Sequence, residues 1–311
     1  MRALVGIEAL TPPDGGAAVT IGTFDGVHVG HRALIARTRE HAAALGAATV
    51  AVTWDRHPHE VVRPHLAPPL VSTPERKLEL LADAGVDVAA VIPFTSDFAR
   101  WPGERFATEV LARGLGARAV LVGEGWRFGQ RARGDVALLA ELGAERGFTV
   151  EAVPLAEVEG DAASSTRVRA AVAEGRMELA HALLGRPFDV DGLVVRGDAR
   201  GTGLGYPTAN VVPDPKLSRP PRGVYAGRAR AGGRWYPTAV NVGVNPTFGG
   251  EEGTTPVKIE AYLLDFRGDL YGDTIRIEFW TRLRDELTFP SVDALVEQMA
   301  RDVEQTRALT C

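Results

Sequence analysis

The segment from Gly22 to His31 combines side chains and backbone groups that suit the binding of a phosphoryl group. Its sequence is Gly-Thr-Phe-Asp-Gly-Val-His-Val-Gly-His, and an apolar run, Ala17 to Ile21, precedes it. Residues with helical spacing follow, so N–H groups at the start of a helix would face a ligand there, and the helix dipole favours an anion. His28 and His31 are one helical turn apart, and two imidazoles can stabilise developing negative charge. Half of a metal site and ordinary surface histidines are the alternatives.

The carboxy-terminal part of the chain lacks histidine, which restricts the choice of a general base there. All seven histidines occur at or before His181. A base that works near neutral pH in the later residues would therefore be a carboxylate. Glu260 lies in an alternating segment, where it shares one strand face with Lys258 and Tyr262. We expect Glu260 to be that base, with an exposed residue on a strand face as the alternative.

A glycine-rich stretch from Gly197 to Asn210 precedes that segment and ends in two oxygen-bearing side chains. Thr208 and Asn210 are two residues apart in an extended segment, so both side chains point the same way. Neutral oxygen ligands, together with nucleotide phosphates and water, suit Mg²⁺. The glycines can lie against phosphates, although no Gly-Lys-Ser/Thr follows them as in a Walker loop. A loop that only stabilises its own turn is the alternative.

Two further segments carry polar side chains at positions where ligands bind. Ser164 opens a predicted helix with the sequence Ser-Ser-Thr-Arg-Val-Arg. Hydroxyl groups at a helix start usually act as caps, but with arginines beside them they can also bind a phosphate. The loop from Trp54 to His59 follows a predicted strand, and such loops bind ligands in open α/β sheets. We therefore expect His57 to line a site, with a solvated loop as the alternative.

The elements that would position these residues fall into two groups, and we place a domain boundary near residue 186. Residues 1–186 alternate predicted strands and helices, which indicates a parallel sheet with helices on both faces. Residues 187–311 contain predicted strands separated by turn signals, which indicate a small antiparallel β-barrel, and then a carboxy-terminal helix after Ser291. The expected strands are Ala17–Ile21, Ala48–Thr53, Val88–Ile92, Ala119–Val122 and Thr149–Val153, followed by Val190–Arg196, Gly223–Ala231, Trp235–Val244, Val257–Phe266 and Thr274–Arg282.

Composition argues against several classes of protein. A net charge of −5 at pH 7 provides no basic surface typical of nucleic-acid binding, so we expect no nucleic-acid partner. No apolar segment is long enough to span a membrane, and the first residues lack the features of a signal peptide. The single cysteine, Cys311, fits a reducing compartment. We expect a cytoplasmic protein that acts on small molecules, and the sequence leaves its oligomeric state open.

The amino-terminal motifs resemble those of a known enzyme family. The end of the Gly22–His31 segment is similar to the His-x-Gly-His signature of the nucleotidyltransferase superfamily, and the whole segment resembles the first module of bacterial bifunctional riboflavin kinase/FAD synthetases. The resemblance implies a Rossmann-like nucleotidyltransferase domain in which His28 and His31 stabilise charge during adenylyl transfer. The nucleotide-binding residues that it implies are Gly22, Phe24, Asp25, Gly26, Ser165, Thr166 and Arg169.

Two positions on the flavin side of this domain depart from the family pattern. The family has Phe-Asp-Pro-His-Pro where this chain has Trp54 to Pro58, with Trp54 and Arg56 as the differences. His57 is the flavin-binding candidate in that segment. Gly125 is the second candidate, at a position where the family has Asn or Asp. The missing polar side chain predicts a slower adenylyl transfer.

The carboxy-terminal motifs resemble the flavokinase domain of the same enzymes. The shared features are Leu-Gly-Tyr-Pro-Thr-Ala-Asn at 204–210, Asn-Pro-Thr at 245–247, Glu-x-x-Leu-Leu-Asp at 260–265 and Asp-Leu-Tyr-Gly at 269–272. The resemblance implies that Thr208 and Asn210 hold Mg²⁺ at ATP and that Glu260 accepts the proton of the riboflavin 5′-hydroxyl. It also implies that Arg284 belongs to a flavin-side loop. The nucleotide-binding residues that it adds are Arg200, Gly201 and Gly205.

The resemblance covers nearly the whole chain, in the domain order of the bifunctional enzyme. It implies ATP-dependent phosphorylation of riboflavin to FMN in the barrel, then adenylylation of FMN to FAD with release of pyrophosphate. Two alternatives remain: a riboflavin kinase with an impaired or altered adenylyltransferase domain, and a non-catalytic flavin-binding regulator. A regulator would need none of His28, His31, Thr208, Asn210 and Glu260, so their joint presence favours the enzyme.

Overall fold

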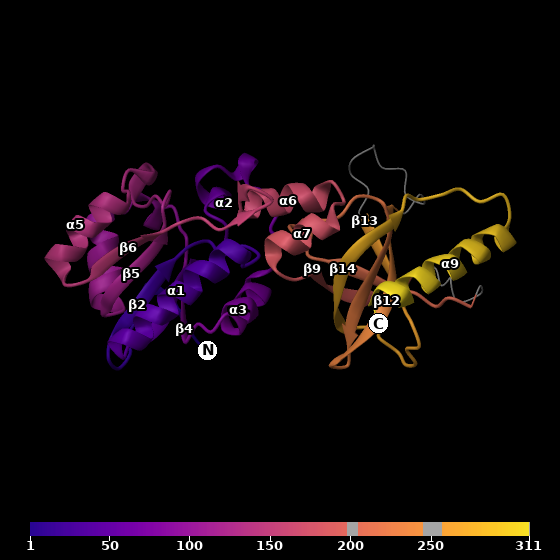
Figure 1. The fold of residues 1–311 in the computed structure, drawn as a ribbon, viewed down its shortest axis with the longest axis horizontal. Helices are drawn as coiled ribbons and strands as arrows, with labels where there is room; N and C mark the ends of the chain where they lie inside the picture. Colours follow the sequence, from indigo (N-terminus) through magenta and orange to yellow (C-terminus); the bar gives the residue numbers. More distant parts are fainter. Residues whose placement is uncertain (198–204, 245–256, 311) are drawn as a thin grey trace. The chain divides into compact units, whose positions relative to one another are not determined.

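The chain forms two compact units, Met1–Ser165 and Thr166–Cys311 (Figure 1). The computed structural model describes residues 1–197, 205–244 and 257–310. None of the helices in these ranges combines the length and the apolar character that a membrane span requires.

The first unit is built around a parallel sheet, as predicted (Figure 1). Its six strands lie in the order β1-β4-β3-β2-β5-β6, so β2 is central, with β3 and β5 on either side. A small two-stranded sheet, β7 and β8, follows. The elements in chain order are β1 Arg2–Val5, β2 Ala17–Ile21, α1 Val29–Leu45, β3 Ala48–Trp54, α2 His59–Val62, α3 Pro74–Asp83, β4 Val88–Ile92, α4 Gly103–Phe106, the π-helix Ala107–Gly114, β5 Ala117–Gly123, α5 Val136–Arg146, β6 Thr149–Val153, β7 Glu157–Val158 and β8 Asp161–Ala162.

Alternation along the central strand places helices on both faces of this sheet. Val19 and Ile21 of β2 pack in a core with Leu111 of the π-helix and Leu139 of α5. Ala18 points to the opposite face and packs with Leu34 of α1. α3 contributes to a third apolar cluster, which it shares with α1. Packing on both faces fixes the positions of the ends of β2 and its neighbours. A site built at those ends depends on such fixed positions.

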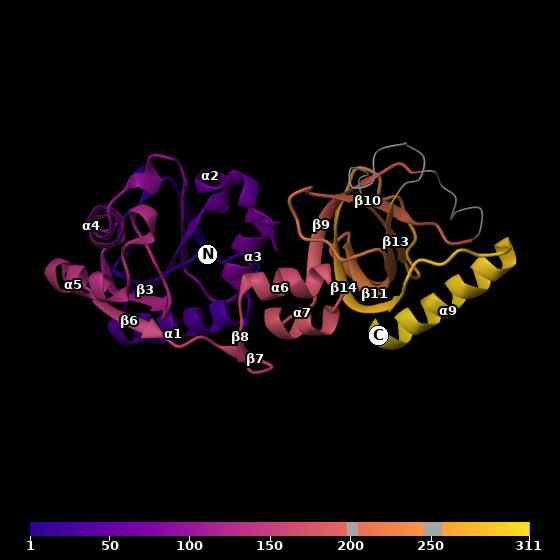
Figure 2. The ribbon, with the colours of Figure 1, turned by 90° about the horizontal axis from the view of Figure 1, so that it is seen from above.

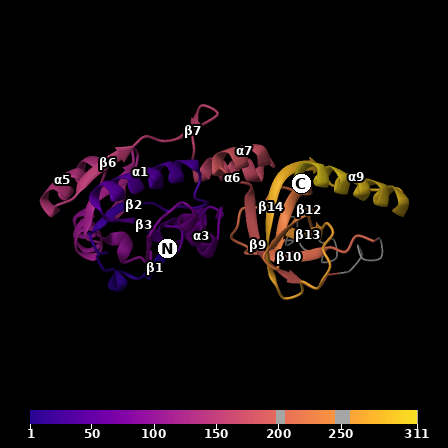
Figure 3. The ribbon, with the colours of Figure 1, turned by 60° about the horizontal axis from the view of Figure 1, so that its bottom comes forward.

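The second unit is a closed antiparallel barrel with helices before and after it, which confirms the predicted barrel (Figure 2). The strands lie in the order β10-β13-β12-β11-β14-β9. Figure 3 shows α9 beside the barrel, where it contacts β11, β12 and β14. The elements are α6 Ser165–Ala173, α7 Met177–Leu184, β9 Phe188–Val195, β10 Ala209–Pro213, β11 Gly223–Ala231, β12 Arg234–Val244, β13 Val257–Leu263, β14 Thr274–Arg284 and α9 Val292–Thr310.

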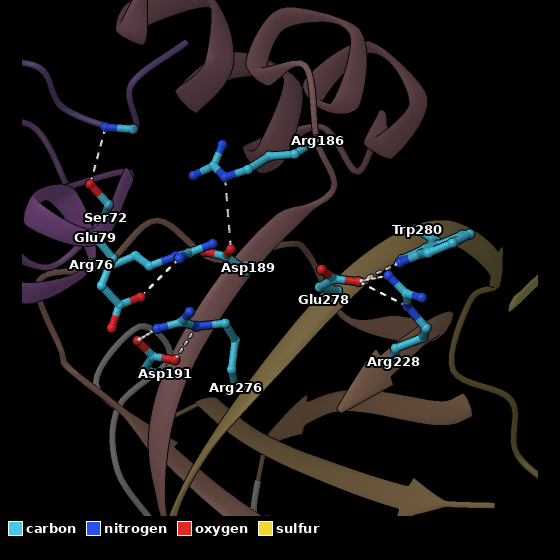
Figure 4. A network of polar contacts seen from close by, with 11 residues as sticks. Ser72, Arg76, Glu79, Arg186, Asp189, Asp191, Arg228, Arg276, Glu278 and Trp280 are labelled. Atoms are coloured by element: carbon cyan, nitrogen blue, oxygen red, sulfur yellow. Dashed lines mark hydrogen bonds and ion pairs between the residues drawn. The ribbon is translucent and has the colours of Figure 1, made fainter. Parts of the chain in front are cut away.

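Ion pairs between directly opposite residues fix the register of β14 in the barrel (Figure 4). Arg276 donates two hydrogen bonds, of 2.7 and 2.8 Å, to Asp191 of β9. On the other side of β14, Glu278 accepts from Arg228 of β11 at 3.1 Å and from the Trp280 indole at 2.9 Å. Opposite charges across a strand pair stabilise one register over its alternatives. These ion pairs therefore fix the alignment of β14 with β9 and with β11.

The division between the compact units differs from the sequence-based boundary. α7 contacts β9 and β14, and the second unit includes α7 and all of α6 after Ser165. The boundary near residue 186 stays a prediction.

Candidate active sites

Three of the predicted segments lie at one edge of the parallel sheet. The Gly22–His31 motif follows β2, the His57 loop follows β3, and the Gly125 loop follows β5. Because these three strands are parallel neighbours, their carboxyl ends share an edge. This is the edge at which open α/β sheets bind their ligands.

The loop between β2 and α1 is held in a strained conformation. Phe24 and Val27 have positive φ angles of 51° and 40°, which side chains rarely adopt. The Asp25 carboxylate accepts hydrogen bonds from the N–H groups of Val71, at 2.9 Å, and Ser72, at 3.1 Å. The Ser72 hydroxyl accepts from the Gly26 N–H at 3.1 Å (Figure 4). Such strain persists only when surrounding contacts determine it, so the loop is preorganised.

Asp25 and Phe24 thus have structural roles that the sequence did not suggest. Asp25 is 4% exposed and holds the loop, while Phe24 is fully buried in the cluster of α1 and α3. A Cβ at residue 22 would lie 3.3 Å from the Phe24 ring, so Gly22 permits this close approach. Nucleotide contacts of Gly22, Phe24, Asp25 and Gly26 stay predictions.

His28 immediately precedes α1, and its ring contacts the ring of His31. Its Nδ1 accepts a hydrogen bond from the His31 N–H at 3.4 Å, so the His28 side chain caps the helix. The two rings are stacked, with centroids 3.6 Å apart. A Cβ at Gly30 would lie 3.1 Å from the His28 ring, which explains a glycine between the histidines. The spacing predicted that the histidines share a face, and the structure brings them together.

Burial, the His28 ring and the charge of Lys77 lower the pKa of His31 well below its usual value. His31 is therefore neutral at pH 7, and any hydrogen bond that it donates to a phosphoryl oxygen comes from a neutral imidazole. Its Nδ1 atom is fully buried and has no partner in the part of the chain that the structure describes.

The other candidates around this edge have different surroundings. The Ser165 hydroxyl donates to the Asp25 carbonyl at 2.8 Å, which joins the start of α6 to the motif loop. His57 caps its own turn, because its Nδ1 accepts from the His59 N–H at 3.2 Å. Thr166 and Arg169 belong to the second compact unit, and their part in phosphate binding stays a prediction.

Gly125 lies exposed in the loop after β5, and its backbone is ordinary. Its φ is outside the positive range, and a Cβ built on it would meet no atom within 4 Å. The backbone therefore does not require glycine, and a side chain at residue 125 would fit.

In the barrel, Asn210 and Glu260 lie on adjacent strands in direct register. Asn210 of β10 pairs with Glu260 of β13, and Asn241 of β12 pairs with Glu260 from the other side. These residues form one row across the barrel wall. The Glu260 carboxylate also forms an ion pair with the Lys258 ammonium, at 2.9 Å. Asn241 was not a candidate from the sequence, because only the strand pairing reveals its position.

Asn210 carries a buried side-chain oxygen that could hold a metal ion. Its side chain is 5% exposed, and its Oδ1 atom is buried with no partner among the described residues. A buried oxygen without a partner is costly unless a ligand completes it. With the Thr208 hydroxyl two residues earlier, the donor set fits Mg²⁺. Gly205 has a φ of +83°, whereas Arg200 and Gly201 lie outside the described residues.

Arg284 is engaged by a residue that the sequence analysis missed. Its guanidinium donates three hydrogen bonds, of 2.7 to 3.1 Å, to Asp302 of α9. Asp302 is 4% exposed. The pair anchors the carboxy-terminal helix to the end of β14. A flavin contact of Arg284 stays a prediction.

Replacing Asp302 by asparagine should therefore destabilise the barrel unit. Loss of charge in a buried hydrogen-bonded pair costs about 1.5–3 kcal/mol. Urea unfolding followed by barrel fluorescence measures this loss, with the exposed α9 pair variant Arg307→Gln as the matched control. An Asp302→Asn protein as stable as the control would contradict the anchoring role.

The parallel α/β unit and the closed barrel match models of two enzyme families, which makes the chain an enzyme of nucleotidyl and phosphoryl transfer. A family model for FAD synthetase matches residues 11–167, and one for riboflavin kinase matches residues 184–310. The chain belongs to the family of bifunctional riboflavin kinase/FMN adenylyltransferases. It synthesises flavin cofactors in two steps, from riboflavin to FMN and from FMN to FAD.

Individual relatives agree with this family over nearly their whole length. The bifunctional enzyme of Pseudomonas fluorescens is 37% identical over 99% of this chain and 98% of its own. That of Escherichia coli K12 is 36% identical over 97% of this chain and 96% of its own. A crystal structure titled a macrolide-efflux protein from Streptococcus pneumoniae has a TM-score of 0.87 at 30% identity and covers 99% of both chains.

Proposed function

We propose that adenylyl transfer takes place at the β2 edge of the first unit and riboflavin phosphorylation beside Glu260 in the barrel. The observation that supports the assignment is that each unit holds its own cluster of candidate residues: the stacked His28 and His31 rings in the first, and the Asn210–Glu260 register pair in the second. The by-products test it, because phosphorylation releases ADP and adenylylation releases pyrophosphate. With ATP present, riboflavin should yield ADP first, and FMN supplied in place of riboflavin should yield only pyrophosphate.

At the sheet edge, an FMN phosphate oxygen attacks the α-phosphorus of ATP, and pyrophosphate leaves. The residues bind and orient rather than react covalently. The N–H groups at the start of α1 and the imidazoles of His28 and His31 stabilise charge on the transferred group. Thr166 and Arg169 are additional phosphate-binding candidates, on the family resemblance. His57 and Gly125 lie in the loops that follow the two neighbouring strands, and we assign them as the flavin-side positions.

In the barrel, Glu260 accepts the proton of the riboflavin 5′-hydroxyl as its oxygen attacks the γ-phosphorus, and ADP leaves. Lys258 orients the carboxylate from the same strand. Enzymes of these families use ATP, generally with a divalent metal. We assign that metal as Mg²⁺, with Thr208 and Asn210 as its protein ligands. When bound, the ion neutralises phosphate charge. We place the protein in the cytoplasm, because both reactions consume ATP and because its single cysteine fits a reducing compartment.

Gly125→Asn should raise FAD synthesis at limiting FMN by about ten- to a hundredfold. The family has a polar side chain there, and one hydrogen bond to a charged group accounts for that range. The open space around residue 125 accommodates the side chain without strain. The measurement is the initial rate of FAD formation from supplied FMN.

Gly125→Ala is the control for this prediction, since it adds a Cβ without a polar group. We expect it to leave FAD synthesis unchanged, while FMN formation from riboflavin is unaffected in both proteins. A slower FAD synthesis in Gly125→Asn would mean that the loop requires glycine for another reason.

A further inference from the structure

Lys77 is a buried charged residue of the first unit, and it belongs to none of the motifs from which the two sites were predicted. It lies on α3 and is 7% exposed. Its Nζ donates to the Trp54 carbonyl at 2.7 Å and to the Thr23 carbonyl at 3.4 Å. Trp54 ends β3, and Thr23 is in the loop that follows β2. One ammonium therefore joins the ends of two neighbouring strands directly beside the Gly22–His31 motif.

A buried ammonium with these partners is expensive for the fold. Carbonyl oxygens, not a carboxylate, accept its hydrogen bonds in the described part of the chain. Burial lowers the pKa of Lys77 to about 8, although Asp25 and Asp55 act in the opposite direction. An apolar side chain of similar length would avoid this desolvation cost. A charge retained at such a cost indicates a role beyond packing.

The position of Lys77 also couples it to the histidines. Its charge acts on His31 of α1 and favours the neutral imidazole. The other titratable groups that face the ammonium are Asp25, in the loop after β2, and Asp55, in the loop after β3. His28 acts on His31 from its stacked ring. Lys77 thus contacts both strand ends and acts electrostatically on His31.

We propose that Lys77 is a positioning residue of the adenylyl-transfer site, where its ammonium fixes the ends of β2 and β3 and keeps a positive charge beside His31. This inference rests on the proposed assignment of His28 and His31 to that reaction. The charge serves two purposes in a site shielded from water. It stabilises anionic phosphoryl groups bound at the start of α1, and it maintains His31 as a neutral donor.

Lys77→Gln tests the charge separately from the hydrogen bond, because the amide can still donate to the Trp54 carbonyl. We expect FAD formation from FMN to slow by about tenfold or more in kcat, with FMN formation by the same protein unchanged. The pKa of His31, followed by NMR of its ring protons, should rise, since a neighbouring positive charge has been removed. Loss of a hydrogen bond without loss of the charge should leave that pKa unchanged.

Lys77→Arg supplies the complementary test, because a guanidinium stays charged at every accessible pH. In the unaltered protein, FAD formation should fall as the pH rises through about 8, where Lys77 loses its proton. In Lys77→Arg that decline should move to higher pH. The matched control is Leu81→Ala, which weakens the packing of the same helix but should leave both the pH profile and the His31 titration unchanged.

The outcomes separate this inference from the site assignment. If His31→Ala keeps full FAD formation, the proposed site is wrong. If His31→Ala loses it but Lys77→Gln matches the unaltered protein in rate and His31 titration, only the role of Lys77 is overturned. Equal loss of both activities in Lys77→Gln also overturns it. Should neither Lys77 variant fold, an ordinary or raised His31 pKa in the unaltered protein contradicts the proposal.

Discussion

Glu260→Gln should lower the rate of FMN formation from riboflavin by about 10²–10⁴-fold, the usual contribution of a general base. The amide keeps the shape of the side chain and its place opposite Asn210, but it cannot accept the hydroxyl proton. FAD formation from supplied FMN should persist, because that reaction uses the other unit. The measurement is the steady-state rate of ADP release with riboflavin, compared with pyrophosphate release with FMN.

Glu278→Gln is the matched control for this substitution. Glu278 is also a glutamate on a barrel strand, and its hydrogen bonds to Arg228 and Trp280 give it a structural role (Figure 4). We expect its replacement to lower the unfolding temperature but to retain kcat for phosphorylation. If Glu260→Gln phosphorylates riboflavin as fast as this control, Glu260 is not the base.

His31→Ala should slow FAD formation by about 10²–10³-fold, the cost of removing one donor to a developing charge, and leave FMN formation intact. For His28, asparagine is the informative replacement, because it preserves a helix cap and removes the imidazole. We expect a similar loss in His28→Asn. The rate of FAD formation from FMN and ATP measures both effects.

The control on the same helix is His41→Ala, which removes the half-buried contact of His41 with Glu151. It should keep both activities. If the neutral form of His31 is the active one, FAD formation in the unaltered protein should also decline on the acidic side, as the pH falls towards the lowered pKa of His31. Loss of both activities in a folded His31→Ala protein would contradict separate sites.

Local patterns predicted most of the fold because each strand has its own signal. Ala17–Ile21, Val88–Ile92, Thr149–Val153 and Gly223–Ala231 have the bounds that were predicted for them. β1 escaped prediction, since it is a short edge strand in which only Leu4 is buried. β10 was expected only as an extended segment, because it is short and ends at Pro213.

Sequence patterns could not predict the side-chain contacts between distant segments. The spacing of His28 and His31 predicted a shared face, but not that one ring caps the helix and stacks on the other. Lys77 had a signal, because it lies three and four residues before Leu80 and Leu81 on an apolar helix face. Asp302 had none, since its partner Arg284 is on another element.

The central claim is that one chain carries two separate sites that act in sequence on the same flavin. The most direct measurement is a single time course with riboflavin, ATP and Mg²⁺, in which chromatography resolves riboflavin, FMN and FAD. We predict that FMN rises first and then falls as FAD accumulates, and that adding His31→Ala protein to Glu260→Gln protein restores FAD synthesis that neither variant achieves alone. Riboflavin that stays unchanged with the unaltered protein, or a mixture of variants that stops at FMN, would contradict the account.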